Sequence, residues 1–135
     1  MTMSRLLRVD DVTGRAGIAV VAAVMLASVG ACRAAEDSVI PGASVERGRR
    51  SLAEFGCGSC HEIRGVRGAH GSVGPPLDGV ASRSIIAGEL PNSPENMVQW
   101  IRDPVATEPN TAMPNLRVSE AAAHDMVAYL YTLRR

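Results

Sequence analysis

Apolar residues recur three or four positions apart in three segments of the chain, at residues 45–55, 94–103 and 119–134. This spacing places the apolar side chains on one face of a helix. A serine precedes or opens each segment, and serine is a favoured N-cap because its side-chain oxygen accepts a hydrogen bond from a free helical N–H group. Gly56 ends the first segment and Pro104 ends the second. The pattern therefore predicts an all-α domain of three or four short helices.

The two intervening segments, residues 63–88 and 104–118, show no helical period. The first is rich in glycine, and the second contains three prolines. Irregular segments of this length are uncommon in a small domain unless they wrap around a body that the chain does not supply. Aromatic residues make up only 3% of the chain, so a core built from protein alone would depend on small aliphatic side chains. Both observations favour a large apolar group inside the domain.

The motif C-x-x-C-H at residues 57–61 indicates what that group is. Two thiols at this spacing can each bond one vinyl group of a haem while the adjacent imidazole binds the iron. A zinc site would need a second pair of ligands, and the remaining cysteine, Cys32, lies far upstream. A thioredoxin-like dithiol would need a βαβ context, and the surrounding sequence predicts no strands. Cys57, Cys60 and His61 therefore predict one covalently attached haem c.

The second axial ligand of the iron distinguishes an electron carrier from an enzyme or sensor, which keeps an open iron position. Met113 lies in a proline-bounded loop without helical period, so helix packing does not explain it. The other methionines of the domain occupy apolar helix faces, where a core role is expected. His70 lies in a glycine-rich loop and His124 on the polar side of the last helix, so both are expected at the surface. We therefore predict His61 and Met113 as the iron ligands.

The N-terminal residues have the features of an export signal. Three arginines precede an uncharged run at residues 16–31, which is too short to span a membrane comfortably and suits a secretory signal. The run ends in small residues before Cys32, and this junction resembles the processing site of a bacterial lipoprotein. We therefore expect removal of residues 1–31, lipidation of Cys32 and a flexible tether at residues 32–43. An ordinary signal peptide or an uncleaved anchor helix is the alternative.

The remaining residues, 44–135, are enough for one domain and too few for two. The full chain carries 14 basic and 14 acidic residues, and every basic residue is arginine. A balanced chain without a basic tail is not typical of a nucleic-acid-binding protein. We expect a monomeric domain outside the cytoplasm, without a nucleic-acid partner.

The order of these motifs resembles the class I cytochrome c family over about residues 44–135. In that family, C-x-x-C-H is followed by Gly-Pro-x-Leu, by an axial methionine in a proline-containing loop, and by a terminal helix that crosses the first helix. The corresponding segments here are Gly74–Leu77, Thr111–Pro114 and residues 119–134. The resemblance implies a small cytochrome c fold, in which a few short helices and long loops enclose the haem.

The resemblance also implies how the haem is surrounded. The Pro75 carbonyl would accept a hydrogen bond from the second ring nitrogen of His61, and Leu77 would pack on the haem face. Arg83 would bind a haem propionate, and Thr111 would form a hydrogen bond to one as well. A solvated loop charge is the alternative interpretation of Arg83.

Trp100 and a contact between two helices also carry over from the family. Trp100 occupies a place where an aromatic residue lines the pocket or reaches the methionine sulfur, and plain core filling is the alternative. Gly48 and Leu52 resemble the pair that lets the terminal helix approach the first helix closely, with Met126 and Tyr129 opposite them. The residues of this helix contact are expected to build the fold and to take no part in the chemistry.

The sequence departs from the mitochondrial type in two ways. It has no lysine ring for docking, and it has a glycine-rich insertion between His61 and Pro75. Arg64, Arg67 and Arg117 are candidates for a sparse basic rim near the haem edge, with scattered solvated arginines as the alternative.

The resemblance implies a single-electron carrier rather than an enzyme. The N-terminal signal and Cys32 add the expectation that lipid holds this carrier on the periplasmic side of a bacterial membrane. A quinol-oxidising complex or a dehydrogenase would reduce it, and a terminal oxidase or another reductase would oxidise it. One alternative is a haem subunit fixed in a larger oxidoreductase. Another is an enzyme or gas sensor with a displaceable sixth ligand, and a soluble periplasmic protein is the alternative location.

Overall fold

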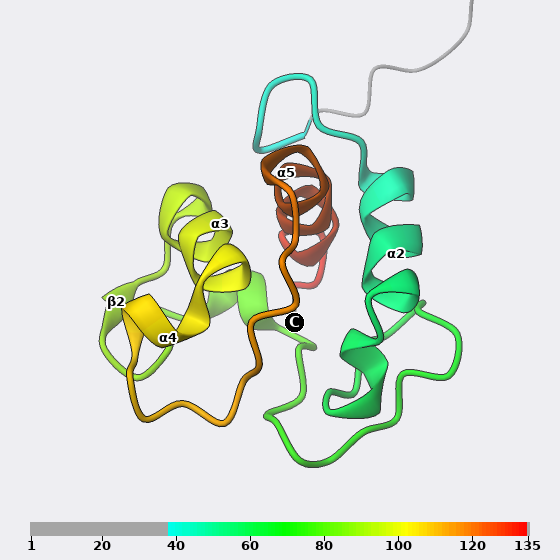
Figure 1. Ribbon diagram of the computed structural model, residues 1–135. Helices are drawn as coiled ribbons and strands as arrows, with labels where there is room; N and C mark the ends of the chain where they lie inside the picture. Colours follow the sequence, from blue (N-terminus) through cyan, green and yellow to red (C-terminus); the bar gives the residue numbers. More distant parts are fainter. Residues whose placement is uncertain (1–37, 135) are drawn as a thin grey trace, which may run out of the picture. The chain divides into compact units, whose positions relative to one another are not determined.

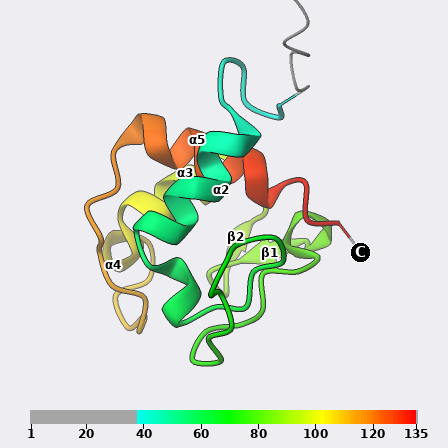
Figure 2. The same ribbon diagram turned by 90° about the vertical axis from the view of Figure 1, so that its right-hand side faces the viewer.

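In the computed structural model, which describes residues 38–134, the three predicted helices are present (Figures 1 and 2). Helix α2 spans Val45–Glu54, α3 spans Pro94–Arg102 and α5 spans Glu120–Leu130. Each begins where a serine hydroxyl oxygen accepts a hydrogen bond from the N–H group three residues later, at 3.2–3.3 Å. The three N-caps are Ser44, Ser93 and Ser119. The predicted helix starts are confirmed, because an N-cap is a signal local to the sequence.

The last helix is shorter than predicted. The apolar period continues toward residue 134, but α5 ends at Leu130 and the chain continues in turns. The Thr132 hydroxyl donates a hydrogen bond to the Tyr129 carbonyl at 2.7 Å, and such a side-chain bond competes with the helical pattern. Leu133 is nevertheless buried in the core, so the apolar spacing marked burial correctly beyond the end of the helix.

A one-turn helix lies where an irregular loop was predicted over residues 104–118. Helix α4 spans Pro104–Thr107, and the Asp103 carboxylate caps it by accepting a hydrogen bond from the Ala106 N–H at 3.2 Å. An Asp-Pro pair is a helix start signal of the same kind as the Ser-Pro pair that opens α3. The prediction treated the proline only as the end of α3 and therefore missed the new start.

The other long loop contains short elements that the sequence did not predict. The 3-10 turn η2, Cys57–Ser59, precedes this loop, and the 3-10 turn η3, Val80–Ser82, lies within it. An antiparallel hairpin joins β1, Ile85–Ile86, to β2, Leu90–Pro91. Strands of two residues show no alternation of apolar and polar positions, so periodicity cannot detect them. The domain therefore remains mainly helical, and the hairpin is a small addition within a loop.

Helices α2 and α5 cross in direct contact, and α5 also packs against α3 (Figure 1). Gly48 lies at the crossing, and a β-carbon there would overlap the backbone carbonyl of Asp125. Leu52, Met126 and Tyr129 are buried in the core that these helices share. The close approach implied by Gly48 is therefore present, because only glycine leaves room for the opposing backbone.

Asp125 joins α5 to the beginning of α2. Its carboxylate accepts hydrogen bonds from the Arg47 guanidinium, at 2.6 Å from Nε and 2.8 Å from Nη2, and from the Ser44 backbone N–H at 2.7 Å. Burial opposes ionisation of this carboxyl, but the hydrogen bonds and the positive charge of Arg47 outweigh burial. They hold the pKa of Asp125 below its usual value.

Asp125→Asn is expected to lower the free energy of unfolding of the haem-loaded protein by about 2 kcal/mol at neutral pH, because Arg47 loses its partner. The folded-state pKa of Asp125 lies below its unfolded value of about 3.9. Its stabilising contribution is therefore present above that value and is lost as the pH falls through the folded-state pKa. Urea unfolding at a series of acidic and neutral pH values should show a smaller acid-induced loss of stability in the variant.

The control for this prediction is Glu120→Gln. Glu120 forms an exposed ion pair with Arg102 at 3.4 Å, so its loss should change the free energy of unfolding by less than about 1 kcal/mol. Equal unfolding free energies for the two variants would contradict a special role of Asp125.

Residues 38–43, expected as the end of a flexible tether, form a turn on the domain. A hydrogen bond to the Ile40 carbonyl closes the turn at 3.1 Å, and the Ile40 side chain packs against the core. The predicted signal segment and Cys32 lie outside the described residues. Within residues 38–134, no helix has both the length and the apolar character needed to cross a membrane.

Candidate haem site

A cavity of about 650 Å³ is lined by residues from α2, α3, α5 and both long loops. Its walls are mainly apolar, and a cavity of this size and character is typical of a cofactor site. The apolar lining includes Leu52, Phe55, Val80, Ile86, Met97, Ile101, Met126 and Leu130. The nine residues that the sequence assigned to the haem line the same cavity, namely Cys57, Cys60, His61, Pro75, Leu77, Arg83, Trp100, Thr111 and Met113.

The C-x-x-C-H motif forms a tight turn beside this cavity. Gly56 has a left-handed φ of 72°, and the 3-10 turn η2 follows it. The N–H groups of Cys60 and His61 both donate to the Cys57 carbonyl, at 3.3 and 3.0 Å. Both thiols are free, and burial raises the pKa of the Cys57 thiol, so it is protonated at neutral pH. The turn thus presents two thiols and one imidazole to a single cavity.

The His61 ring is held by a hydrogen bond between Nδ1 and the Pro75 carbonyl oxygen, 2.7 Å long. A carbonyl oxygen only accepts, so Nδ1 carries the hydrogen, and in the neutral form of the ring Nε2 then has the free lone pair. Gly74 makes this arrangement possible, because a β-carbon at that position would overlap the ring. The structure contains the hydrogen bond that the resemblance implied, and it leaves Nε2 as the ring atom free to bind a metal.

The glycine-rich insertion packs directly on the C-x-x-C-H turn. The Gly71 N–H donates to the Gly58 carbonyl at 3.0 Å. A β-carbon at Gly58 would overlap Ala69, and one at Gly71 would overlap the backbone of Ser59. The two backbones therefore touch where side chains are absent. The sequence showed this insertion only as a departure from the mitochondrial type, because its bracing role depends on contacts between separate segments.

Met113 lines the cavity from the loop between α4 and α5. Its N–H donates to the Thr111 hydroxyl oxygen at 3.1 Å, so Thr111 fixes the turn that presents the methionine. The Met113 side chain is half-buried, and Trp100 lines the same cavity from α3. The structure therefore brings the predicted pair of His61 and Met113 to one cavity.

Arg83 lines the cavity from the loop that follows η3. Its guanidinium donates a hydrogen bond to the Pro76 carbonyl, and the residue is half-buried. Among the described residues that line the cavity, Arg83 is the only arginine. It is therefore the cationic group placed to meet an acidic substituent of a cofactor.

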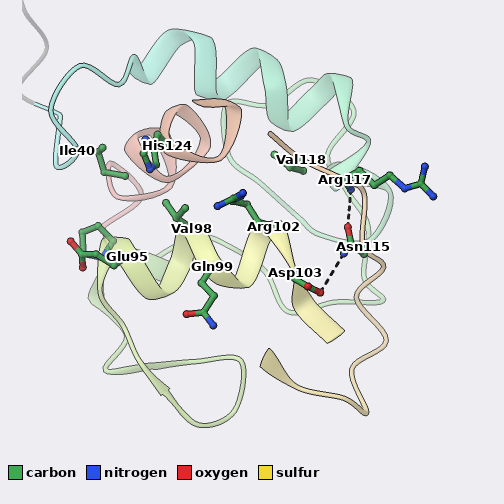
Figure 3. Close-up of a pocket in the computed structure, with 11 residues that line it drawn as sticks. Ile40, Glu95, Val98, Gln99, Arg102, Asp103, Asn115, Arg117, Val118 and His124 are labelled. Carbon is green, nitrogen blue, oxygen red and sulfur yellow. Dashed lines mark hydrogen bonds between the residues drawn. The ribbon is translucent and has the colours of Figure 1, made fainter. Parts of the chain in front are cut away.

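A second pocket, of about 690 Å³, lies between α3, α5 and residues 115–118 (Figure 3). The Asn115 side chain spans its edge, donating to the Asp103 carboxylate at 3.3 Å and accepting from the Arg117 N–H at 2.9 Å. His124 lines this pocket and does not line the haem cavity. Its lining includes no cysteine or methionine, so it lacks the thiols that would attach a haem and the thioether of the predicted ligand pair.

The three arginines considered as a basic rim do not line the haem cavity. Arg117 lines the second pocket, and Arg67 is exposed. Arg64 forms an ion pair with Asp78 at 3.7 Å and donates to the Arg134 carbonyl at 3.2 Å. The structure therefore favours scattered arginines over a rim that converges on the cavity.

Comparison with known proteins agrees with the chemistry of the cavity. Residues 45–134 match the family model for cytochrome c. Over 89 residues the chain is 35% identical to cytochrome c oxidase subunit 2 of Alkalihalophilus pseudofirmus, a match that covers 65% of this chain and 25% of that relative. The match thus spans about a quarter of that relative's length. Free thiols, a free imidazole nitrogen and apolar walls in one cavity fit a haem, and the chain belongs to the cytochrome c family, whose members carry covalent haem c and transfer electrons.

Proposed function

We propose that the protein is a class I cytochrome c with one haem, which carries single electrons between redox proteins. The observation that supports this most directly is that His61 and Met113 line the same cavity as both thiols of the motif. Haem c, when bound, supplies an iron that accepts and returns one electron. Cys57 and Cys60 hold the haem covalently, His61 binds the iron through Nε2, and Met113 binds it through its sulfur.

The surrounding residues orient these ligands. The Pro75 carbonyl holds the His61 ring and makes it a stronger electron donor to a metal. Leu77 and Trp100 enclose the haem face, and Arg83 pairs with a propionate. A bound haem would take both iron ligands from the protein, and the soft thioether of Met113 would favour its ferrous state.

A terminal oxidase is the proposed electron acceptor, with a quinol-oxidising complex or a dehydrogenase as donor. The related protein from Alkalihalophilus pseudofirmus is a cytochrome c oxidase subunit 2, which supports this choice. The same relative favours a second candidate, a haem subunit fixed in a larger oxidoreductase, because its cytochrome-like region is only part of a longer protein. Co-purification with an oxidase through high salt and gel filtration would favour the fixed subunit, and free elution as a monomer would favour the carrier.

We also propose that the domain is held outside the cytoplasm by lipid on Cys32 after removal of residues 1–31. The resemblance of the residues before Cys32 to a lipoprotein processing site supports this anchor. The mature protein should then partition into detergent, and Cys32→Ala should abolish this. An unmodified mature N-terminus in mass spectrometry would contradict lipid anchoring.

Electron transfer to the oxidase is expected to change little between about 0.01 M and 0.1 M salt, although the Debye length falls from about 30 Å to about 10 Å. The large exposed residues that line the cavity, Val73, Ile85 and Leu116, are apolar. The three arginines that were candidates for a basic rim, Arg64, Arg67 and Arg117, do not line the cavity. Stopped-flow oxidation of the reduced protein by oxidase-containing membranes measures the rate.

Replacing these three arginines with glutamine should leave the rate within about twofold of wild type. Val73→Glu is the matched change at the cavity and should slow transfer by placing a charge in an apolar contact. A rate that falls steeply with salt in the wild type, but not in the arginine variant, would show that a basic surface guides docking.

A further inference from the structure

The side chain of Asn92 connects three segments of the chain. Its Nδ2 group donates to the carbonyls of Val80 and Arg83, at 2.8 Å each. Its Oδ1 atom accepts a hydrogen bond from the Tyr131 hydroxyl at 2.8 Å. Burial raises the pKa of Tyr131, so its hydroxyl remains protonated and donates. Both donors of the amide group and its oxygen acceptor are therefore used, as expected for a half-buried amide that fixes its surroundings.

These bonds fix the backbone from which Arg83 extends. Val80 is the first residue of the 3-10 turn η3, and Arg83 directly follows its last residue. The Asn92 backbone N–H also donates to the Ser84 carbonyl at 3.0 Å. Asn92 thus holds the strand-like segment after η3 by both its main chain and its side chain. The position of the Arg83 guanidinium in the cavity depends on this support.

The Arg83 guanidinium binds the carbonyl next to the one that accepts the His61 hydrogen bond. It donates to the Pro76 carbonyl, and the preceding carbonyl, that of Pro75, accepts the His61 Nδ1 hydrogen. Neither proline has an N–H group, so the backbone bonds that hold this segment come from the two flanking residues: the Gly74 N–H donates to the Cys60 carbonyl and the Leu77 N–H to the Glu62 carbonyl, at 2.8 Å each. Arg83 therefore restrains a peptide segment whose geometry sets the orientation of the His61 ring.

We propose that Asn92 is a positioning residue of the haem pocket. Tyr131 holds the Asn92 side chain, and Asn92 in turn fixes the backbone of Arg83. The Arg83 guanidinium then restrains the segment that carries the hydrogen-bond acceptor of His61 and contributes to the reduction potential of the iron. This inference rests on the proposed role of His61 as an iron ligand. Loss of Asn92 would let the guanidinium leave the cavity that would hold the haem. The ferric state, which has one more positive charge, is then less disfavoured, so the reduction potential falls.

The test compares Asn92→Ala and Tyr131→Phe with wild type by potentiometric titration of the purified haem-loaded protein. Both changes are neutral in charge, and Tyr131→Phe removes only the hydroxyl. Asn92→Ala should shift the equilibrium with a fixed mediator about threefold toward the ferric form, and Tyr131→Phe should shift it in the same direction by less. Hydrogen exchange of the His61 Nδ1–H in the ferrous protein should become about tenfold faster in Asn92→Ala.

The matched control is Asn96→Ala. Asn96 also donates from its side chain to a nearby carbonyl, that of Pro91, at 2.8 Å, but it donates no hydrogen bond to the carbonyls of Val80 and Arg83. It should lower stability without changing the potential or the exchange of the ring hydrogen. If all three variants lose stability but keep the wild-type potential, Asn92 has only a structural role, and the proposal is wrong.

Pairing the change with Arg83→Gln tests the path of the effect. If Asn92 acts through Arg83, Asn92→Ala should add no further shift in an Arg83→Gln background. A full additional shift would overturn the proposal, as would wild-type potentials in both Asn92→Ala and Tyr131→Phe. If Asn92→Ala does not fold, Tyr131→Phe in the two backgrounds decides the question. Failure of the proposed function would instead appear in the wild type, as an absorption spectrum without histidine and methionine ligation.

Discussion

Met113→Ala is expected to lower the reduction potential by about 0.2 V, a part of the roughly 0.8 V range over which axial ligands set haem potentials. The ferric protein should also lose the weak long-wavelength absorption band of sulfur ligation. The ferrous protein should bind carbon monoxide, because one iron position becomes open. These effects follow from the place of Met113 in the same cavity as His61. Potentiometry and absorption spectroscopy measure them.

Met97→Ala is the matched control for this variant. Met97 also lines the cavity, but it lies on α3 and is buried in the core. Its truncation should cost about 2 to 4 kcal/mol of stability while leaving the sulfur band in place. If Met97→Ala loses the band and Met113→Ala keeps it, the ligand assignment is wrong.

Replacing both Cys57 and Cys60 with alanine is expected to abolish covalent haem and to leave the chain largely unfolded. The cavity of about 650 Å³ is lined by residues of the core, and without a haem these side chains lose the surface on which they pack. Circular dichroism should show loss of most helical signal. The haem remaining with the protein after alkaline pyridine denaturation should fall from one per chain to none.

Single replacements separate the tethers from the fold. Cys57→Ala or Cys60→Ala should each impair maturation and leave any attached haem with one bond. A double variant that retained haem through extraction with acidic organic solvent would contradict attachment by this motif. A folded double variant without haem would instead show that the apolar core is sufficient by itself.

The parts of the fold that the sequence predicted depend on local signals. The serines at 44, 93 and 119 act within one helical turn, so the helix starts follow from neighbouring residues. The contact at Gly48 came instead from the resemblance to the cytochrome c family, and the structure contains it, because a β-carbon at Gly48 would overlap the Asp125 carbonyl. By contrast, the prediction missed α4. Asp103 both ends α3 and caps α4, and the prediction assigned only the end of a helix to this place.

The rest depends on contacts between segments that are distant in the sequence. Met97 and Met126 occupy helix faces that mark burial, but the pattern cannot show that they also face a cofactor cavity. Asn92 precedes an N-cap and looks like a loop residue, yet its partners include Tyr131, 39 positions away. Likewise, the turn formed by Ile40 against the core could not be inferred from a polar segment.

Exposure of the native ferrous protein to carbon monoxide tests most directly whether His61 and Met113 together fill both axial positions of the iron. A carrier with two ligands held by the protein should keep its absorption spectrum in carbon monoxide at neutral pH, and it should still be oxidised and reduced reversibly by one electron. Rapid formation of a carbon monoxide complex by the unmodified protein would contradict this ligation. It would then indicate a sensor or an enzyme with an accessible iron.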